Sequence, residues 1–183
     1  MKADNVELRF NGADGLDSLL VASREGTTHL WFDQPSRIWK RELITIGEPQ
    51  RPGQEEDSES PGSGDHWGSG CVDAGRIGDD PFAYIATLDP FHGTTCCVLT
   101  KQNRGIRGTV GEWKRQVLDV FGTTNQLNHT GDGPGHFIIC ADFDGDGDDE
   151  FLLGLFGSLD RDEDGEAIPV SLRVIAFFIE AIY

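Results

Sequence analysis

The sequence is poor in basic side chains. Its 183 residues include 15 Lys and Arg against 32 Asp and Glu, which gives a formal net charge of −17. A nucleic-acid-binding protein needs clustered Lys and Arg to neutralise phosphates, and attachment to an anionic membrane surface needs the same charges. We therefore expect neither a nucleic acid nor a membrane as a partner. The acidic excess favours simple solubility, with cation binding as the alternative.

Targeting signals and long apolar runs are also missing. Residues 1–10 lack the apolar core of a signal peptide. No stretch approaches the roughly 18 apolar residues that a membrane span requires. These absences make the cytoplasm the default expectation for the compartment.

Cysteine and methionine are scarce, and long helical periodicity is absent. The four Cys, at 71, 96, 97 and 140, have no CxxC spacing, which argues against a zinc ribbon or a thioredoxin motif. Cys96 and Cys97 are adjacent in an apolar run, so we expect them to be reduced and to lie on the core and surface sides of one strand. The 24 Gly and single Met favour strands and turns, and the length favours one domain.

Internal repeats are the most informative pattern. Residues 111–120 (GEWKRQVLDV) resemble residues 38–46 (IWKRELITI), and both have the alternation of a half-buried strand. Each is followed by a Gly-rich loop that ends in a His, which is His66 in the first copy and His136 in the second. An acidic turn and an apolar strand come next. A more divergent copy spans residues 10–23.

Each repeat has the pattern of four antiparallel strands, which is the unit of a β-propeller blade. Aligning Asp17, Asp80 and Asp149 gives a period of about 60–70 residues. The central copy predicts strands near 70–74, 82–88, 94–101 and 113–120. The polar segment 47–65 is expected to be a mobile loop between blades.

The chain is too short for a closed propeller. Propellers close with about 4–8 blades, whereas this sequence accounts for roughly two and a half. An open set of blades leaves apolar edges exposed. The chain is therefore a fragment, or it self-associates, or the propeller interpretation is wrong, and we favour the fragment. The prediction is an all-β fold, a partial β-propeller over residues 1–169.

The C-terminal residues 170–183 (VSLRVIAFFIEAIY) break the repeat pattern. The run is apolar, lacks turn signals and resembles no part of the repeats. Its first two residues, Val-Ser, are also what an intron donor would encode if it were read through in frame. Our hypothesis is that this tail is translated intron, and an ordinary final strand or helix is the alternative. Comparing transcript with genomic sequence would decide between them.

Residues 142–150 (DFDGDGDDE) place carboxylates at alternating positions of a Gly-containing turn. Such carboxylates converge on one centre, and a hard cation such as calcium takes six to eight oxygens. The expected ligands are the side chains of Asp142, Asp144, Asp146 and Glu150, with the backbone carbonyl of Asp148. An EF-hand is excluded because Leu153 stands where that loop needs its twelfth-position Glu. The loop predicts a calcium or magnesium site, and an Asp-rich turn without an ion is the alternative.

This loop resembles the cation loop of FG-GAP and VCBS repeats in integrin-type propellers, where the ion braces the turn. The equivalent turns at 11–18 and 73–80 have lost most of their carboxylates and are expected to bind nothing. Residues 160–166 have DxDxDG spacing but lack the flanking strand pattern. We expect a solvated loop there, with a second cation site as the alternative.

Three of the five His fall on one predicted face. His66 and His136 precede the innermost strand of their repeats, and His92 lies in the turn between a second and a third strand. These positions share one edge of an antiparallel blade, opposite the acidic loop. Convergent His near a hub can hold zinc or act as general acid and base. Capping of turns through hydrogen bonds is the alternative, and His29 and His129 are left out of the site.

Three strings together resemble the N-terminal propeller of the fungal aldos-2-ulose dehydratases, also called 1,5-anhydro-D-fructose dehydratases. They are DPFHG (89–93), WKRQVLDVFG (113–122) and the run from GDGPGHF through the acidic loop to EAIP (131–169). The resemblance covers most of residues 5–169. It implies a seven-bladed propeller followed by cupin-type and lectin-like domains. For the full-length form we expect a homodimer.

The resemblance also implies a function. The activity would be that of a lyase that removes water from small 2-keto sugars such as glucosone and 1,5-anhydro-D-fructose. Carried over to this sequence, His66, His92 and His136 would be zinc ligands or catalytic residues, and the acidic loop would hold a divalent ion. Elimination next to a ketone needs α-proton abstraction, carbonyl polarisation and protonation of the leaving hydroxyl, which a zinc ion and a His can supply. Because blades and domains are missing, we expect an incomplete site and an inactive isolated chain.

Two further functions stay open. The first is a non-catalytic, calcium-braced propeller module that binds a glycan or a protein. The second is a propeller-type polysaccharide lyase. An acidic polymer would need a long electropositive groove, so the net charge of −17 disfavours the second.

Overall fold

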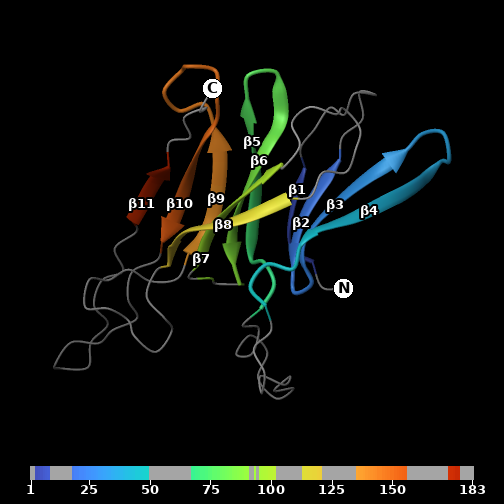
Figure 1. Cartoon of the computed structure of the whole chain (residues 1–183), viewed down its shortest axis with the longest axis horizontal. Helices are drawn as coiled ribbons and strands as arrows, with labels where there is room; N and C mark the ends of the chain where they lie inside the picture. The colour runs from blue at the N-terminus through green and yellow to red at the C-terminus, as the bar shows by residue number, and fades with distance from the viewer. Residues whose placement is uncertain are drawn as a thin grey trace, which may run out of the picture.

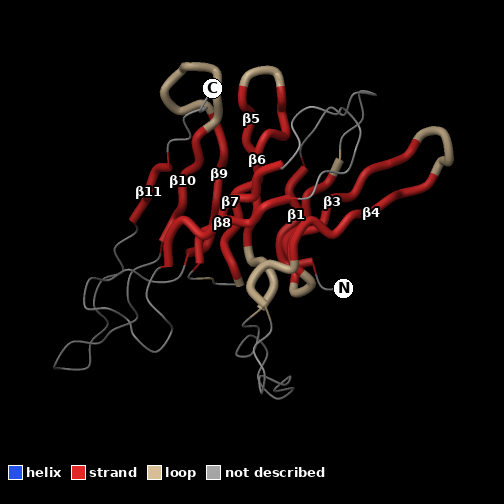
Figure 2. The backbone as a smooth tube through the Cα atoms, viewed as in Figure 1, coloured by secondary structure: helices blue, strands red, loops and turns tan. Residues whose placement is uncertain are grey.

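The described part of the chain consists of strands and the turns that join them. The computed structural model describes residues 3–8, 18–49, 67–90, 93, 95–101, 113–120, 135–155 and 173–177. Within these ranges there are eleven strands and no helix, so the predicted all-β class is confirmed (Figure 2). No helix in the described ranges is long and apolar enough to cross a membrane.

The strands form three antiparallel sheets that stand side by side (Figure 1). The first sheet has the order β1 (Ala3–Leu8), β2 (Leu19–Ser23), β3 (Gly26–Asp33) and β4 (Ile38–Thr45). The second has the order β5 (Cys71–Ile77), β6 (Asp80–Asp89), β7 (Thr95–Lys101) and β8 (Trp113–Val120). The third has the order β11 (Arg173–Phe177), β10 (Glu150–Leu155) and β9 (Gly135–Ala141).

The second sheet is the four-stranded unit expected for the central repeat, and its strands lie close to the predicted ranges. One predicted turn is wrong. Most of the segment 73–80 is strand, because β5 continues to Ile77 and β6 begins at Asp80. Only residues 78 and 79 are left as the turn. The number of blades stays a prediction.

The two WKR segments occupy equivalent places on β4 and β8. Arg41 pairs with Leu30 and Arg115 pairs with Leu99, and both partners are the fifth residue of their strands, β3 and β7. Repeated sequence therefore corresponds to repeated register in the first and second sheets.

The second sheet is covered on both faces. One apolar cluster fills the space between the first and second sheets: Leu20, Ala22, Val72, Ala74, Ile85 and Leu99. A larger cluster fills the space between the second and third sheets, and it includes Leu88, Cys96, Phe151, Leu153 and Leu155. Each fully buried Leu or Phe contributes about 1.5–3 kcal/mol. These two clusters fix how the sheets stand against one another.

The cysteines show the consequence of this two-sided burial. Cys96 and Cys97 are both 0% exposed, so the expectation that one of them faces the surface is wrong. Successive side chains of β7 point to opposite faces, but neighbouring sheets cover both faces. Cys71 and Cys140 are also buried, and all four thiols are free. Burial raises the pKa of the Cys96 and Cys97 thiols to about 12, which leaves little reactive thiolate near neutral pH.

The C-terminal tail contributes β11, which pairs antiparallel with β10 at the edge of the third sheet. Residues 173–177 are thus a strand, whichever origin the tail has. The boundary at residue 169 and the intron hypothesis stay predictions. The predicted loop 47–65 and the predicted turn 11–18 fall largely outside the described residues, and the acidic run 160–166 falls wholly outside them.

Candidate cation loop and histidine-bearing edge

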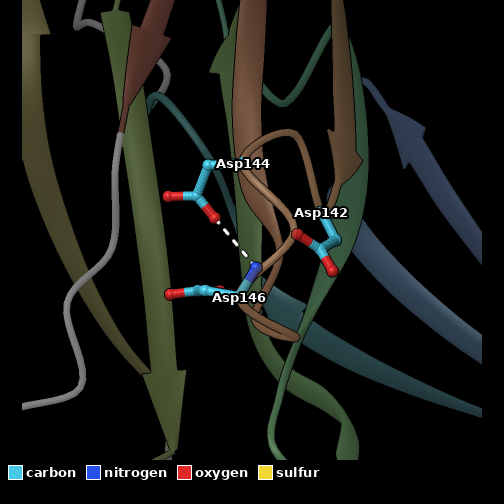
Figure 3. A group of neighbouring side chains, drawn as sticks. All are labelled: Asp142, Asp144 and Asp146. Atoms are coloured by element: carbon cyan, nitrogen blue, oxygen red, sulfur yellow. Dashed lines mark hydrogen bonds between the residues drawn. The ribbon is translucent and has the colours of Figure 1, made fainter.

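The β9–β10 connection is an acidic loop shaped by its own carboxylates (Figure 3). Asp142 accepts from the Gly145 N–H at 2.6 Å and from the Gly147 N–H at 3.1 Å, and Asp144 accepts from the Asp146 N–H at 3.1 Å. Gly145 and Gly147 have φ of 85° and 101°, a backbone region that residues other than Gly rarely adopt. The alternation of Asp and Gly therefore encodes the bend.

Three of the predicted ligands come together in this loop. Asp142, Asp144 and Asp146 each offer one carboxylate oxygen, and these oxygens lie within 4.8 Å of one another. Oxygens bound to one calcium at about 2.3–2.6 Å are at most about 5.2 Å apart, whereas octahedral magnesium at about 2.1 Å spans only about 4.2 Å. The donor chemistry suits either hard cation, and a spacing within 4.8 Å is compatible with calcium.

The other two predicted ligands make different contacts. The Asp148 side chain accepts from the Gly78 N–H at 2.7 Å, in the β5–β6 turn. Glu150 is 2% exposed, and its carboxylate accepts from the Phe143 N–H at 3.0 Å. Neither carboxylate joins the group of three. The ligand roles of the Asp148 carbonyl and the Glu150 side chain stay predictions.

The loop is also attached to the second sheet, which the sequence reasoning missed. Asp149 accepts from the Arg76 backbone N–H at 2.9 Å and from its guanidinium at 3.3 Å, and its own N–H donates to the Arg76 carbonyl at 2.9 Å. The Tyr84 hydroxyl donates to the Asp149 carbonyl at 2.6 Å. Arg76 Nη2 also lies 3.9 Å from Asp142 Oδ2. The acidic loop thus joins the third sheet to the β5–β6 turn, at one end of both sheets (Figure 1).

The sequence predicts that three histidines lie at the opposite end of these sheets. His136 is the second residue of β9 and is exposed, while His66 and His92 lie outside the described residues. The backbone beside His136 contacts the turn that contains His92, because the Gly135 N–H donates to the Gly93 carbonyl at 2.8 Å. We call this end the histidine-bearing edge, and define it by the described residues 67–70 before β5, 89, 90 and 93 between β6 and β7, and 135–136 at the start of β9.

A buried ion pair lies at this edge. Asp89, the first residue of DPFHG, has a side chain that is 0% exposed. Its Oδ2 accepts from Arg115 Nη2 at 2.9 Å and from Arg115 Nε at 3.2 Å. Arg115 Nη2 also lies 3.4 Å from Glu48 Oε2. Burial raises the pKa of Asp89 above its usual range, and the Arg115 guanidinium acts against that shift.

The comparisons with known proteins show what the chain is similar to. Residues 4–102 match the family described as "Aldos-2-ulose dehydratase, beta-propeller domain". Over 153 residues the chain is 40% identical to the aldos-2-ulose dehydratase of Phanerodontia chrysosporium. This aligned stretch is 83% of this chain and 15% of that relative. The chain belongs to the aldos-2-ulose dehydratase β-propeller family.

Family membership confirms the resemblance expected from the sequence strings and the propeller class of the fold. The matched residues 4–102 include DPFHG but end before the acidic loop and before His136. The ligand and catalytic roles of these residues therefore rest on the geometry above and on chemistry. The chain spans 15% of its relative, which agrees with the expectation of a fragment.

His29, which was left out of the predicted site, has a structural environment. Its Nε2 lies 2.9 Å from Ser18 Oγ, and its ring lies 5.2 Å from the Trp31 ring and 5.3 Å from the Phe82 ring, between centroids. Burial, with a smaller contribution from the positive charge of Lys101, lowers the pKa of His29 below 6.5.

The pKa of His29 leads to a stability prediction. Below about pH 6.5 the unfolded chain takes up a proton on His29 that the folded chain does not, so the free energy of unfolding falls as pH falls. The His29 share of this slope approaches at most about 1.4 kcal/mol per pH unit. Urea unfolding of the wild type and of His29→Gln between pH 7 and pH 5 measures it. We expect a shallower slope in the variant, and equal slopes would contradict the assignment.

Proposed function

We propose that this chain is part of the propeller of a carbohydrate dehydratase that eliminates water from small 2-keto sugars such as glucosone and 1,5-anhydro-D-fructose. Family membership supports the dehydratase class. The observation that carries the site is the hydrogen bond from the Gly135 N–H to the Gly93 carbonyl at 2.8 Å. It joins the last residue of DPFHG to a residue of GPGHF, and in the sequence these two Gly directly follow His92 and directly precede His136.

In this proposal the three histidines His66, His92 and His136 form the sugar site. Neutral imidazole nitrogens are the donors that zinc takes in catalytic sites, so the residue set fits that ion. A bound zinc would polarise the ketone of the substrate. A His that does not hold zinc would take the proton from the carbon next to the ketone and, once protonated, would give it to the departing hydroxyl, which leaves as water. The cupin-type and lectin-like domains, the remaining blades and a dimer partner belong to the full-length protein in the same proposal.

Assays of the full-length protein with 1,5-anhydro-D-fructose and glucosone, with and without zinc, test this function. We expect loss of turnover when His66, His92 or His136 is replaced by Ala. His129→Ala is the matched control, because His129 has no role in the proposed site. Turnover that survives loss of all three histidines would reject the site.

We assign the acidic loop a structural calcium ion, with magnesium as the alternative. The carboxylates of Asp142, Asp144 and Asp146 supply the site, and the contacts of Asp148 and Asp149 connect it to the β5–β6 turn. An ion that neutralises the three carboxylates would stabilise the loop and, through these contacts, the packing of the third sheet on the second.

Calcium is therefore expected to raise the thermal stability of the chain. Binding to the folded state alone adds about 2.7 kcal/mol when calcium is at a hundred times its Kd. Thermal unfolding with calcium, with magnesium and with a chelator measures the shift. Asp144→Asn should abolish most of it, whereas Asp162→Asn, in the acidic run 160–166, should leave it unchanged. The same shift in both variants would contradict the assignment.

The second candidate function is a non-catalytic module that binds a glycan or a protein. The hydrogen bonds between the acidic loop and the second sheet favour this function, because they hold the two sheets together without requiring a catalytic role. Retention of 1,5-anhydro-D-fructose by the full-length protein without turnover, with or without zinc, would support this function over the dehydratase.

A further inference from the structure

Arg115 connects segments that are far apart in the sequence. It lies on β8, and both Nη2 and Nε contact Asp89 Oδ2, at 2.9 and 3.2 Å. Asp89 ends β6 and begins the turn to β7. The guanidinium thus binds the first residue of the β6–β7 connection, which is one segment of the histidine-bearing edge.

The second contact of Arg115 leads to another of these segments. Arg115 Nη2 lies 3.4 Å from Glu48 Oε2. The Glu48 N–H donates to the Gly68 carbonyl at 2.9 Å, and the Gly68 N–H donates to the Glu48 carbonyl at 2.8 Å. Gly68 is two residues after His66 in the sequence. Arg115 therefore contacts both the segment that leads into β5, through Glu48, and the turn that follows β6, through Asp89.

The third segment is joined to the same turn through the backbone. The carbonyl of Gly93 accepts from the N–H of Gly135, at the start of β9. A shift of the turn would therefore move or break the contact with β9. Arg115 thus contacts the β6–β7 turn through Asp89 and the segment before β5 through Glu48, and the start of β9 is bonded to the same turn.

The equivalent arginine of the first sheet makes a weaker contact. Arg41, in the same register on β4, lies 3.7 Å from Glu25, and the two side chains are 57% and 49% exposed. Glu25 lies in the β2–β3 turn, whereas the position equivalent to Asp89, at the end of β2, is taken by Ser23. An exposed pair contributes little, whereas a buried carboxylate depends on its cation. In the second sheet the pair is buried on the Asp89 side and includes Glu48, and its turn belongs to the histidine-bearing edge.

We propose that Arg115 is the positioning residue of the histidine-bearing edge. Its guanidinium fixes Asp89 and Glu48 relative to each other and so sets the spacing of the three segments. The effect of Arg115 on catalysis rests on the proposed function. Its effect on the spacing of the segments can be measured without turnover.

The experiment compares Arg115→Gln with Arg41→Gln in the full-length protein. Hydrogen exchange of the Gly135 amide reports the geometry, and zinc titration with kcat and KM reports the site. Loss of a residue that orients ligands lowers metal affinity by about 10–100-fold. We expect faster Gly135 exchange, at least about tenfold weaker zinc binding and a lower kcat in Arg115→Gln, partial recovery in Arg115→Lys, and wild-type values in Arg41→Gln.

Two outcomes would separate the hypotheses. Wild-type Gly135 exchange in Arg115→Gln overturns the positioning role, whatever the activity. Faster exchange in that variant, with a wild-type protein that neither binds zinc nor turns over sugar, overturns the proposed function and leaves the geometric role standing. If Arg115→Gln does not fold, Asp89→Asn provides the same measurements, because it removes the charge of the pair and keeps the side-chain shape.

Discussion

Replacing Asp73 by Ala is expected to cost about 3–6 kcal/mol of the free energy of unfolding, because two hydrogen bonds to a carboxylate are lost, each worth about 1.5–3 kcal/mol. Asp73 lies on β5 and is 1% exposed. Its Oδ2 accepts from the Cys140 N–H of β9 at 2.7 Å, and its Oδ1 accepts from the Ala74 N–H at 2.8 Å. The first bond crosses from the second sheet to the third. In the variant the Cys140 N–H would stay buried without this acceptor.

Urea unfolding of the wild type and of three variants measures this cost. Asp73→Asn keeps one acceptor oxygen and should lose less than Asp73→Ala. Asp79→Ala, on the exposed β5–β6 turn, removes an equal charge and should stay within about 0.5 kcal/mol of wild type. A cost of Asp73→Ala no larger than that of Asp79→Ala would show that the crossing bond does not hold the sheets together.

The contacts between sheets are the part of the fold that the sequence pattern did not predict. Alternation of apolar and polar residues identified the strands of the second sheet, and the WKR repeat identified their equivalence to the first. The alternation is a local signal. The contact of Asp73 with Cys140 joins residues 67 positions apart, as does that of Glu48 with Arg115. Cys97 was misplaced for the same reason, since its burial depends on a neighbouring sheet.

The acidic loop was more predictable than the histidine-bearing edge. Its three clustered carboxylates fall within five consecutive residues, from Asp142 to Asp146, so their convergence is set by local geometry. The histidines belong to three segments that meet only through tertiary packing. The repeat alignment predicted that the histidines share one end of the sheets, which for His66 and His92 stays a prediction. It gave no sign of Arg115, whose contacts depend on a buried partner. Sequence alone thus predicts the loop better than the edge.

Placing a methyl group on Gly75 is expected to destabilise the chain by about 2–4 kcal/mol, from about 1–3 for overpacking and about 1 for a lost hydrogen bond. A Cβ at this position of β5 would lie 1.9 Å from Cζ of the Tyr84 ring. Tyr84 is 1% exposed and packs in the cluster between the second and third sheets. The ring would have to move, and its hydroxyl would lose the Asp149 carbonyl of the acidic loop.

A double-mutant cycle identifies the cause of this loss. If the clash with Tyr84 is responsible, Gly75→Ala should cost far less in a Tyr84→Ala background than in the wild type, a departure from additivity of the size seen for residues in contact. Gly78→Asn is the control, because a Cβ there has no atom within 4 Å and Asn tolerates its φ of 54°. An equal cost of Gly75→Ala in both backgrounds would instead assign the effect to the β5 backbone. Because Tyr84 also contacts the acidic loop, Gly75→Ala should reduce the stabilisation by calcium, whereas Gly78→Asn should reduce it less.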